Sequence, residues 1–183
     1  MVLDSHSLCG LEENPLNNSM NIKTIKNFLD KDFFEEVKKL IIESDFAWFK
    51  RKSMVTGTTN NLGYFCHSFY YNSMVICNTY FKYILPILNK LNSKAVVEVR
   101  ANLFPSVFFN KSDFHTDNNF KCKTAILYLN TCDGGTEFKI NDNITFVKAE
   151  ENKIVVFDSN VAHRAITSKN ANFRYIINFN YYD

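Results

Sequence analysis

The second half of the chain consists of short stretches in which apolar and polar residues alternate and β-branched and aromatic side chains are frequent. These stretches cover residues 96–103, 124–130, 144–148, 154–158 and 173–182. Alternation with a period of two predicts strands that bury one face. The Gly134-Gly135 and Asp158-Ser159-Asn160 segments between them are typical of turns. Short strands without helical patterns between them predict an antiparallel sandwich or barrel.

The first half carries helical patterns instead. Asp30 is a suitable N-cap for a helix whose apolar residues recur at helical spacing. A second apolar stripe predicts a helix over residues 74–92, capped by Ser73 and kinked or split at Pro86. The polar and aromatic segment 50–72 predicts a long loop or an irregular hairpin. Together the patterns predict an α+β fold, mainly β, that is buttressed by N-terminal helices.

The length of the chain, 183 residues, is ordinary for one domain. We expect residues 1–20 to form a loose leader and residues 21–94 to supply helical support and a loop region. Residues 95–183 are then the β core of the same domain. The sequence contains no internal repeat that would indicate a solenoid or a second copy of a domain.

Charge and cysteine content exclude several functional classes. A net charge of +2 is too weak for a surface that tracks a nucleic-acid backbone. The five cysteines are odd in number and form no Cys-x-x-Cys pair, which argues against a disulfide framework or a zinc ribbon. No signal-peptide pattern and no apolar run of membrane-spanning length is present. We therefore expect a cytoplasmic protein without membrane contact, and nothing indicates its oligomeric state.

Two histidines and an aspartate carry the chemistry. His115 and Asp117 are two residues apart, so on an extended chain their side chains share one face. His163 follows the apolar strand at 154–157, and Arg174 begins the last strand. Two neutral imidazoles and one carboxylate form the triad of non-haem Fe(II) sites, which leaves coordination positions for an α-keto acid and dioxygen. The guanidinium of Arg174 suits the distal carboxylate of such a keto acid.

The remaining basic side chains are interpreted as structural or solvated. His6 and His67 stand alone in the sequence, and a substrate contact by His67 is left open because it lies in the segment 50–72. Arg164, next to His163, is expected to be a solvated charge rather than a substrate contact. The lysines around the first motif are expected to be solvated as well: Lys111, Lys121 and Lys123.

In this order, the motifs resemble those of the 2-oxoglutarate/Fe(II)-dependent oxygenase superfamily, in particular its prolyl-hydroxylase-like branch. The resemblance covers roughly residues 95–182. Its matching segments are Phe114–Asp117 for the first metal motif, Thr124–Asn130 and Asp133–Phe138 for the strands that follow, Asn152–Asp158 before the second histidine, and Arg174-Tyr175 for the co-substrate arginine.

The resemblance implies a double-stranded β-helix, a distorted jelly roll, with Fe(II) held by His115, Asp117 and His163. It implies that Arg174 and Tyr128 bind the distal carboxylate of 2-oxoglutarate and that Asn102 and Asn178 make further polar contacts. Phe104 departs from the family pattern because it lacks a hydroxyl. The implied reaction uses O₂, with ascorbate as an optional reductant, and hydroxylates a peptidyl or amino-acid side chain with release of succinate and CO₂.

Other functions remain open at this point. A catalytically silent jelly-roll binding protein would keep the fold without turnover. A zinc hydrolase on the same ligands would leave Arg174 and Tyr128 without a role, and a cupin would require a His-x-His motif that is absent. Aromatic residues in segments 50–72, 104–114 and 117–123 would suit a peptide proline, a nucleobase or a small molecule equally well. The fold does not determine the substrate.

Overall fold

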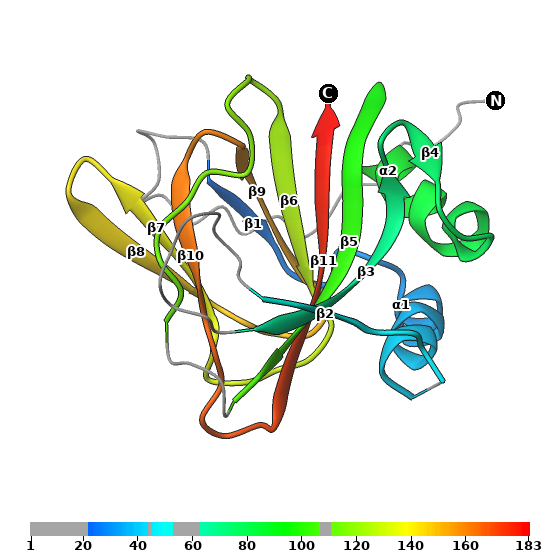
Figure 1. Cartoon of the computed structure of the whole chain (residues 1–183), viewed down its shortest axis with the longest axis horizontal. Helices are drawn as coiled ribbons and strands as arrows, with labels where there is room; N and C mark the ends of the chain where they lie inside the picture. The colour runs from blue at the N-terminus through cyan, green and yellow to red at the C-terminus, as the bar shows by residue number, and fades with distance from the viewer. Residues whose placement is uncertain (1–21, 44, 53–62, 107–110) are drawn as a thin grey trace, which may run out of the picture.

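The computed structural model describes residues 22–43, 45–52, 63–106 and 111–183. The predictions for residues 1–20 and for His6 lie outside these ranges. Within them the chain forms a large and a small antiparallel sheet (Figure 1). The large sheet has the order β1-β9-β6-β11-β5-β3-β2, with β4 paired to β3, and the small sheet has the order β10-β7-β8.

The strands of the large sheet are β1 (Lys23–Ile25), β2 (Phe49–Arg51), β3 (Tyr64–Tyr71), β4 (Met74–Val75), β5 (Ala95–Pro105), β6 (Lys123–Tyr128), β9 (Lys153–Asp158) and β11 (Phe173–Tyr182). Those of the small sheet are β7 (Gly135–Ile140), β8 (Asn143–Lys148) and β10 (Ala162–Ile166). Gly135 begins β7 close to β8, where an added Cβ would lie 2.1 Å from the Val147 carbonyl oxygen. Only glycine fits there.

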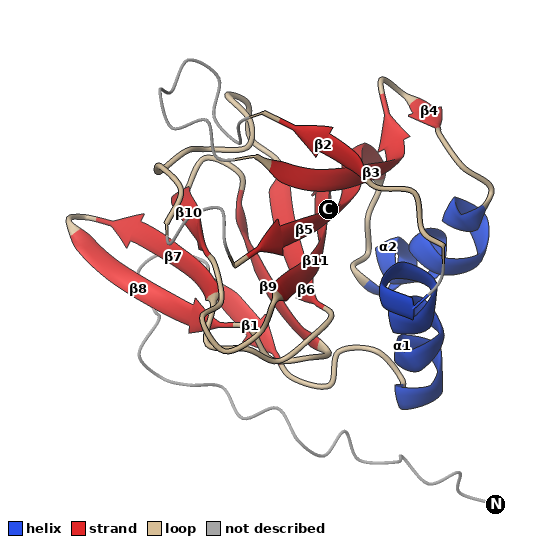
Figure 2. Cartoon of the chain, turned by 60° about the horizontal axis from the view of Figure 1, so that its bottom comes forward, coloured by secondary structure: helices blue, strands red, loops and turns tan. Residues whose placement is uncertain are grey.

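Alternation along the central strands divides the interior into two cores. On β11, Ile177 and Phe179 pack with the helices, whereas Ile176 packs with the small sheet. Figures 1 and 2 show the helices on one side of the large sheet and the small sheet on the other. The second core contains Phe138 of β7 and Phe157 of β9, and it surrounds the space between the two sheets.

The first helix agrees with its prediction. Helix α1 (Lys31–Lys38) begins after Asp30, whose carboxylate accepts from the backbone N–H groups of Asp32 at 3.0 Å and Phe33 at 3.5 Å. A π-helical turn (Lys39–Glu43) extends it. Its buried residues are Phe34, Val37 and Ile41, which face the large sheet.

The second helix was predicted too long. Residues 74 and 75 form β4, and Ser73 has a positive φ of 60° in the turn between β3 and β4, so it is not an N-cap. The helical part comprises a π-helical turn (Tyr80–Ile84) followed by α2 (Leu85–Lys90). The helix changes from π to α next to Pro86, which lies in the first turn of α2, so the predicted split of the helix lies at this residue.

Segment 50–72 is a hairpin at its described ends, because β2 and β3 pair antiparallel. Its second strand, β3, also pairs with β5 and so belongs to the interior of the large sheet. Cysteines 66, 77, 122 and 132 are free thiols. None of the helices within the described ranges is long and apolar enough to cross a membrane.

Candidate metal centre

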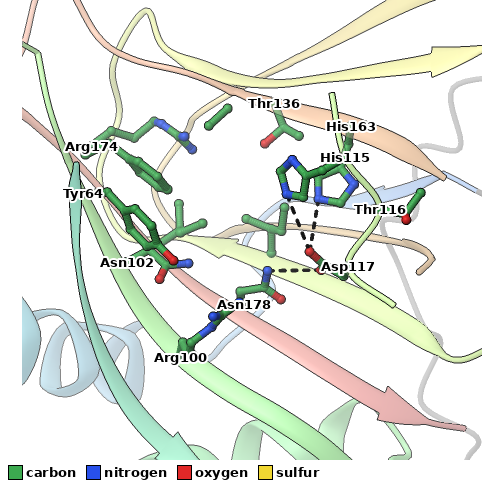
Figure 3. Close-up of a pocket in the computed structure, with 14 residues that line it drawn as sticks. Tyr64, Arg100, Asn102, His115, Thr116, Asp117, Thr136, His163, Arg174 and Asn178 are labelled. Atoms are coloured by element: carbon green, nitrogen blue, oxygen red, sulfur yellow. Dashed lines mark hydrogen bonds and ion pairs between the residues drawn. The ribbon is translucent and has the colours of Figure 1, made fainter. Parts of the chain in front are cut away.

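The structure brings His115, Asp117 and His163 together between the two sheets (Figure 3). His115 and His163 form an isolated antiparallel bridge, with N···O distances of 3.0 and 2.9 Å, so their side chains lie side by side. Asp117 Oδ1 lies 3.8 Å from His115 Nε2 and 3.6 Å from His163 Nε2. One ligand atom from each residue lies within 4.8 Å of the others. These three residues are called the triad below.

Both imidazoles are oriented by backbone carbonyls. His115 Nδ1 lies 3.3 Å from the Asp113 carbonyl oxygen, and His163 Nδ1 lies 2.9 Å from that of Val161. When Nδ1–H donates to these carbonyls, the lone pair is on Nε2, which faces Asp117. A carbonyl on the remote nitrogen is the usual way in which a protein fixes the tautomer of a metal-binding histidine.

The Asp117 carboxylate is also held in one orientation. Its Oδ2 accepts from Thr124 Oγ1 at 3.1 Å and from Asn178 Nδ2 at 3.3 Å, which leaves Oδ1 directed toward the histidines. Burial alone would raise the pKa of Asp117, but His163, His115 and Asn178 together lower it well below its usual range. The group therefore stays anionic at any pH at which the protein works.

The pKa values of the two histidines are shifted in opposite directions. Burial and the neighbouring His163 lower the pKa of His115. Burial also lowers the pKa of His163, but the hydrogen bond and charge of Asp117 outweigh it, so the net pKa of His163 is raised. In the metal-free protein, His163 is thus the imidazole that retains a proton beside the carboxylate. A bound cation would take the place of that proton.

Thr124 is expected to set the affinity for metal through Asp117. Thr124→Val keeps the shape of the side chain but removes one of the two donors to Oδ2, so we expect metal affinity to fall about tenfold. Thr124→Ser, which keeps the hydroxyl, is the matched control. Titration of both variants with Ni(II) measures the effect, and equal affinities would contradict a positioning role. The same hydroxyl lies 2.7 Å from Asn180 Oδ1, so unfolding should be followed in parallel.

Arg174 lies in the same cavity, and no carboxylate among the described residues forms an ion pair with it. Its side chain is 1 % exposed, and its Nε and Nη1 have no hydrogen-bond partner among the described residues. The guanidinium lies 4.4 Å from the centroid of the Phe104 ring, and burial lowers its pKa. A buried cation without an anion is costly. A cavity of about 240 Å³ joins it to the triad, so an anion that also reaches the metal position fits these residues.

The other predicted co-substrate residues lie in or behind this cavity. Asn102 lines it, and its Oδ1 is buried without a donor. Asn178 also lines it, but its amide donates to Asp117. Tyr128 is fully buried behind the wall, where its hydroxyl donates to Thr136 Oγ1 at 2.8 Å and Thr136 faces the cavity.

Two predictions about basic residues need correction. Arg164 is not a solvated charge, because its Nη2 lies 2.6 Å from Glu137 Oε2 and its guanidinium lies 4.2 Å from the Phe114 ring centroid. Lys123 is also not fully solvated, because it is 23% exposed and pairs with Asp158. Lys111 and Lys121 are exposed as predicted, although Lys111 also pairs with Glu137. The pair of Arg164 with Glu137 joins β10, which carries His163, to β7.

His67 lies on the face of β3 that is remote from the cavity. It stacks near Phe46 and Phe69, and its Nδ1 lies 2.9 Å from the Ala47 carbonyl oxygen. It does not line the cavity, so the structure gives it a place in the aromatic core and not at the site. Four polar cavity residues were not predicted as site residues: Tyr64, Arg100, Thr116 and Thr136. The only available signal for Arg100 was its alternation with Asn102 on one strand face.

Comparison with known proteins gives structural matches only. No protein-family model and no curated protein matches the sequence. A prolyl hydroxylase from Trichoplax adhaerens, solved with a hypoxia inducible factor peptide fragment, superposes with a TM-score of 0.68 at 17% identity, over 91% of this chain and 85% of its own. The prolyl-4-hydroxylase of Pseudomonas putida gives 0.62 at 16% identity, over 90% and 94%. The chain has the fold of the 2-oxoglutarate/Fe(II) oxygenases.

The same fold also serves other reactions. The α-ketoglutarate-dependent epimerase SnoN from nogalamycin biosynthesis gives a TM-score of 0.64 at 11% identity, over 90% of this chain and 78% of its own. The predicted fold class is thereby confirmed, and the structural matches include prolyl hydroxylases. In this chain the triad, whose residues could hold a metal ion, lines the cavity between the large and the small sheet.

Proposed function

We propose that the protein is an Fe(II)- and 2-oxoglutarate-dependent dioxygenase that hydroxylates a peptidyl or amino-acid side chain. The observation that carries the proposal is the buried guanidinium of Arg174, which lies in one cavity with the triad and whose Nε and Nη1 have no partner in the described part of the chain. A zinc hydrolase would leave this cation without a partner. It would also lack a general base, because Asp117 is the only carboxylate among the described residues that line the cavity.

Each residue then has a defined task. His115, Asp117 and His163 hold the metal from one side and leave its remaining positions open, as the ligand set of non-haem iron enzymes does. Arg174 pairs with the distal carboxylate of 2-oxoglutarate through its planar fork. Ile126 and Ile176 supply apolar walls that exclude water from the cavity.

When bound, iron and 2-oxoglutarate supply with O₂ the oxidant for an unactivated C–H bond. The balance is one oxygen atom in the new hydroxyl group and one in succinate, with loss of CO₂. The protein contributes geometry and charge, and no side chain acts as a nucleophile. The structural neighbours act on a peptide or on a small molecule, so the fold alone does not determine the substrate.

Succinate production tests the proposal directly. Protein purified without oxygen and loaded with Fe(II) is expected to form succinate and CO₂ from 2-oxoglutarate when O₂ is admitted, slowly alone and faster with the correct substrate. Peptides, free amino acids and nucleosides are offered in parallel, with zinc-loaded protein as the control. Equal succinate with zinc would refute an iron-dependent dioxygenase. No succinate with iron across all three sets would favour a silent binding protein.

A further inference from the structure

A second arginine lines the cavity at a distance from Arg174. The side chains of Arg100, Asn102 and Phe104 occupy alternate positions of β5 and share the face that lines the cavity. The register pairs Arg100 with Asn178 and Phe104 with Arg174. The two arginines are therefore about 13 Å apart along the strands. In Figure 3 they lie at separate ends of the cavity, and the triad lies on the facing wall.

The guanidinium of Arg100 is only partly satisfied. Within the described chain it makes one ion pair, from Nε to Glu98 Oε1 at 3.4 Å. Its side chain is 23% exposed, so it is neither sealed in the core nor free in bulk water. The two terminal nitrogens remain for a ligand, and such a planar fork matches a carboxylate with two parallel hydrogen bonds.

Acceptors without donors lie next to this cation. Asn102 Oδ1 and Asn178 Oδ1 are buried and lack a hydrogen-bond partner within the described ranges, and their side chains are 5% and 7% exposed. The hydrogen bond to Asp117 fixes which end of the Asn178 amide is the oxygen. A buried acceptor that lacks a donor is costly, so a ligand with N–H groups satisfies this part of the wall. A ligand that carries a carboxylate beside an ammonium group supplies both the anion for Arg100 and the N–H donors for these two oxygens.

Charge and size favour a small ligand without net charge. The formal charges of Arg100 and Arg174, of the carboxylates of Glu98 and Asp117, and of a bound divalent metal with its dicarboxylate co-substrate add up to zero, although no carboxylate among the described residues forms an ion pair with Arg174. The cavity of about 240 Å³ lies below the range of about 300–1,000 Å³ that is usual for ligand pockets. The co-substrate has to share this space. What remains suits a free amino acid better than a peptide segment.

We propose that Arg100 binds the carboxylate of a free α-amino acid, whose ammonium group donates to the amide oxygens of Asn102 and Asn178. This arrangement presents the amino-acid side chain to the metal. The inference rests on the proposed function, because the bound amino acid is the substrate that is hydroxylated. Arg100 is then the residue that selects a free amino acid over an internal residue of a peptide.

Binding to the full chain tests this without turnover. The Ni(II)-loaded protein with 2-oxoglutarate is titrated with proteinogenic L-amino acids, with their carboxamides, and with N-acetylated peptides, and binding is followed by calorimetry. At least one amino acid is expected to bind about tenfold or more tightly than its carboxamide, because a neutral carboxamide cannot accept the two parallel, charge-assisted hydrogen bonds of the guanidinium. Arg100→Gln should weaken that amino acid about 10- to 100-fold.

A matched control distinguishes the loss of the guanidinium of Arg100 from the loss of one positive charge anywhere on the protein. Lys82→Gln removes the same charge from an ion pair on the helical side, where the Lys82 side chain is 65% exposed, and should leave amino-acid affinity unchanged. If Arg100→Gln does not fold, Arg100→Lys keeps the charge without the fork and should still weaken binding. Carboxamides that bind as well as acids, peptides that bind while amino acids do not, or equal affinities for Arg100→Gln and Lys82→Gln would overturn the inference. Retained binding of Ni(II) and 2-oxoglutarate in those cases would leave the proposed function standing.

Discussion

Replacing Arg174 by methionine is expected to abolish 2-oxoglutarate binding and, at the same time, to stabilise the ligand-free protein. The guanidinium is 1% exposed and has no carboxylate partner among the described residues. Removing an uncompensated buried charge should therefore raise the free energy of unfolding, by about 1–4 kcal/mol less the lost contact with the Phe104 ring. The same substitution removes the cation that the co-substrate needs. A substitution that stabilises the ligand-free protein but abolishes 2-oxoglutarate binding indicates a site that is preorganised for an anion.

Chemical denaturation and 2-oxoglutarate titration of the metal-loaded variants measure both effects. Arg174→Lys keeps the charge but loses the fork, so it should weaken 2-oxoglutarate strongly while metal binding stays near that of the parent. Arg164→Met is the matched control, because Arg164 is paired with Glu137 and its removal should lower stability. If Arg174→Met destabilises the ligand-free protein or costs metal and 2-oxoglutarate equally, Arg174 is a structural residue.

The triad was predictable because its determinants are local. Residues two apart on an extended chain share a face, which brings His115 and Asp117 together. His163 follows the buried strand β9 by five residues and lies in β10 of the small sheet. The structure adds the bridge between His115 and His163, which no periodicity encodes. Asp30 is similar, since an N-cap depends only on the residues of the first turn.

The predictions that are wrong concern residues whose structure is determined by contacts with residues far away in the sequence. Residues 74 and 75 are apolar and were included in the predicted helix over residues 74–92, but they pair with β3 and form a strand. Arg164 and Glu137 are far apart in the sequence and meet only because β10 pairs with β7. Arg100 resembles any charge on a half-buried strand until the register of β5 and β11 places it on the cavity face.

The pH dependence of the metal-free protein follows from the triad. The folded state lowers the pKa of Asp117 from 3.8 and raises that of His163 from 6.5. The contribution of Asp117 is present above 3.8 and is lost as pH falls. That of His163 is complete below 6.5 and is lost as pH rises through its raised value. The advantage in stability of the parent over Asp117→Asn should therefore be largest between these two pH values when no metal is bound.

The affinity for metal should rise with pH, whereas the contribution of His163 to stability falls with pH. A cation must displace the proton of His163, so the affinity of the parent for Ni(II) should rise about tenfold per pH unit until that proton is gone. Asp117→Asn removes the anion from the ligand set, so its affinity should fall by more than the about 10- to 100-fold that the loss of an outer partner costs. Titration at several pH values, with proton release measured by calorimetry in buffers of different ionisation enthalpy, tests both statements. An affinity that is independent of pH would mean that metal binding displaces no proton from His163, and an Asp117→Asn variant that binds Ni(II) like the parent would mean that Asp117 is not a metal ligand.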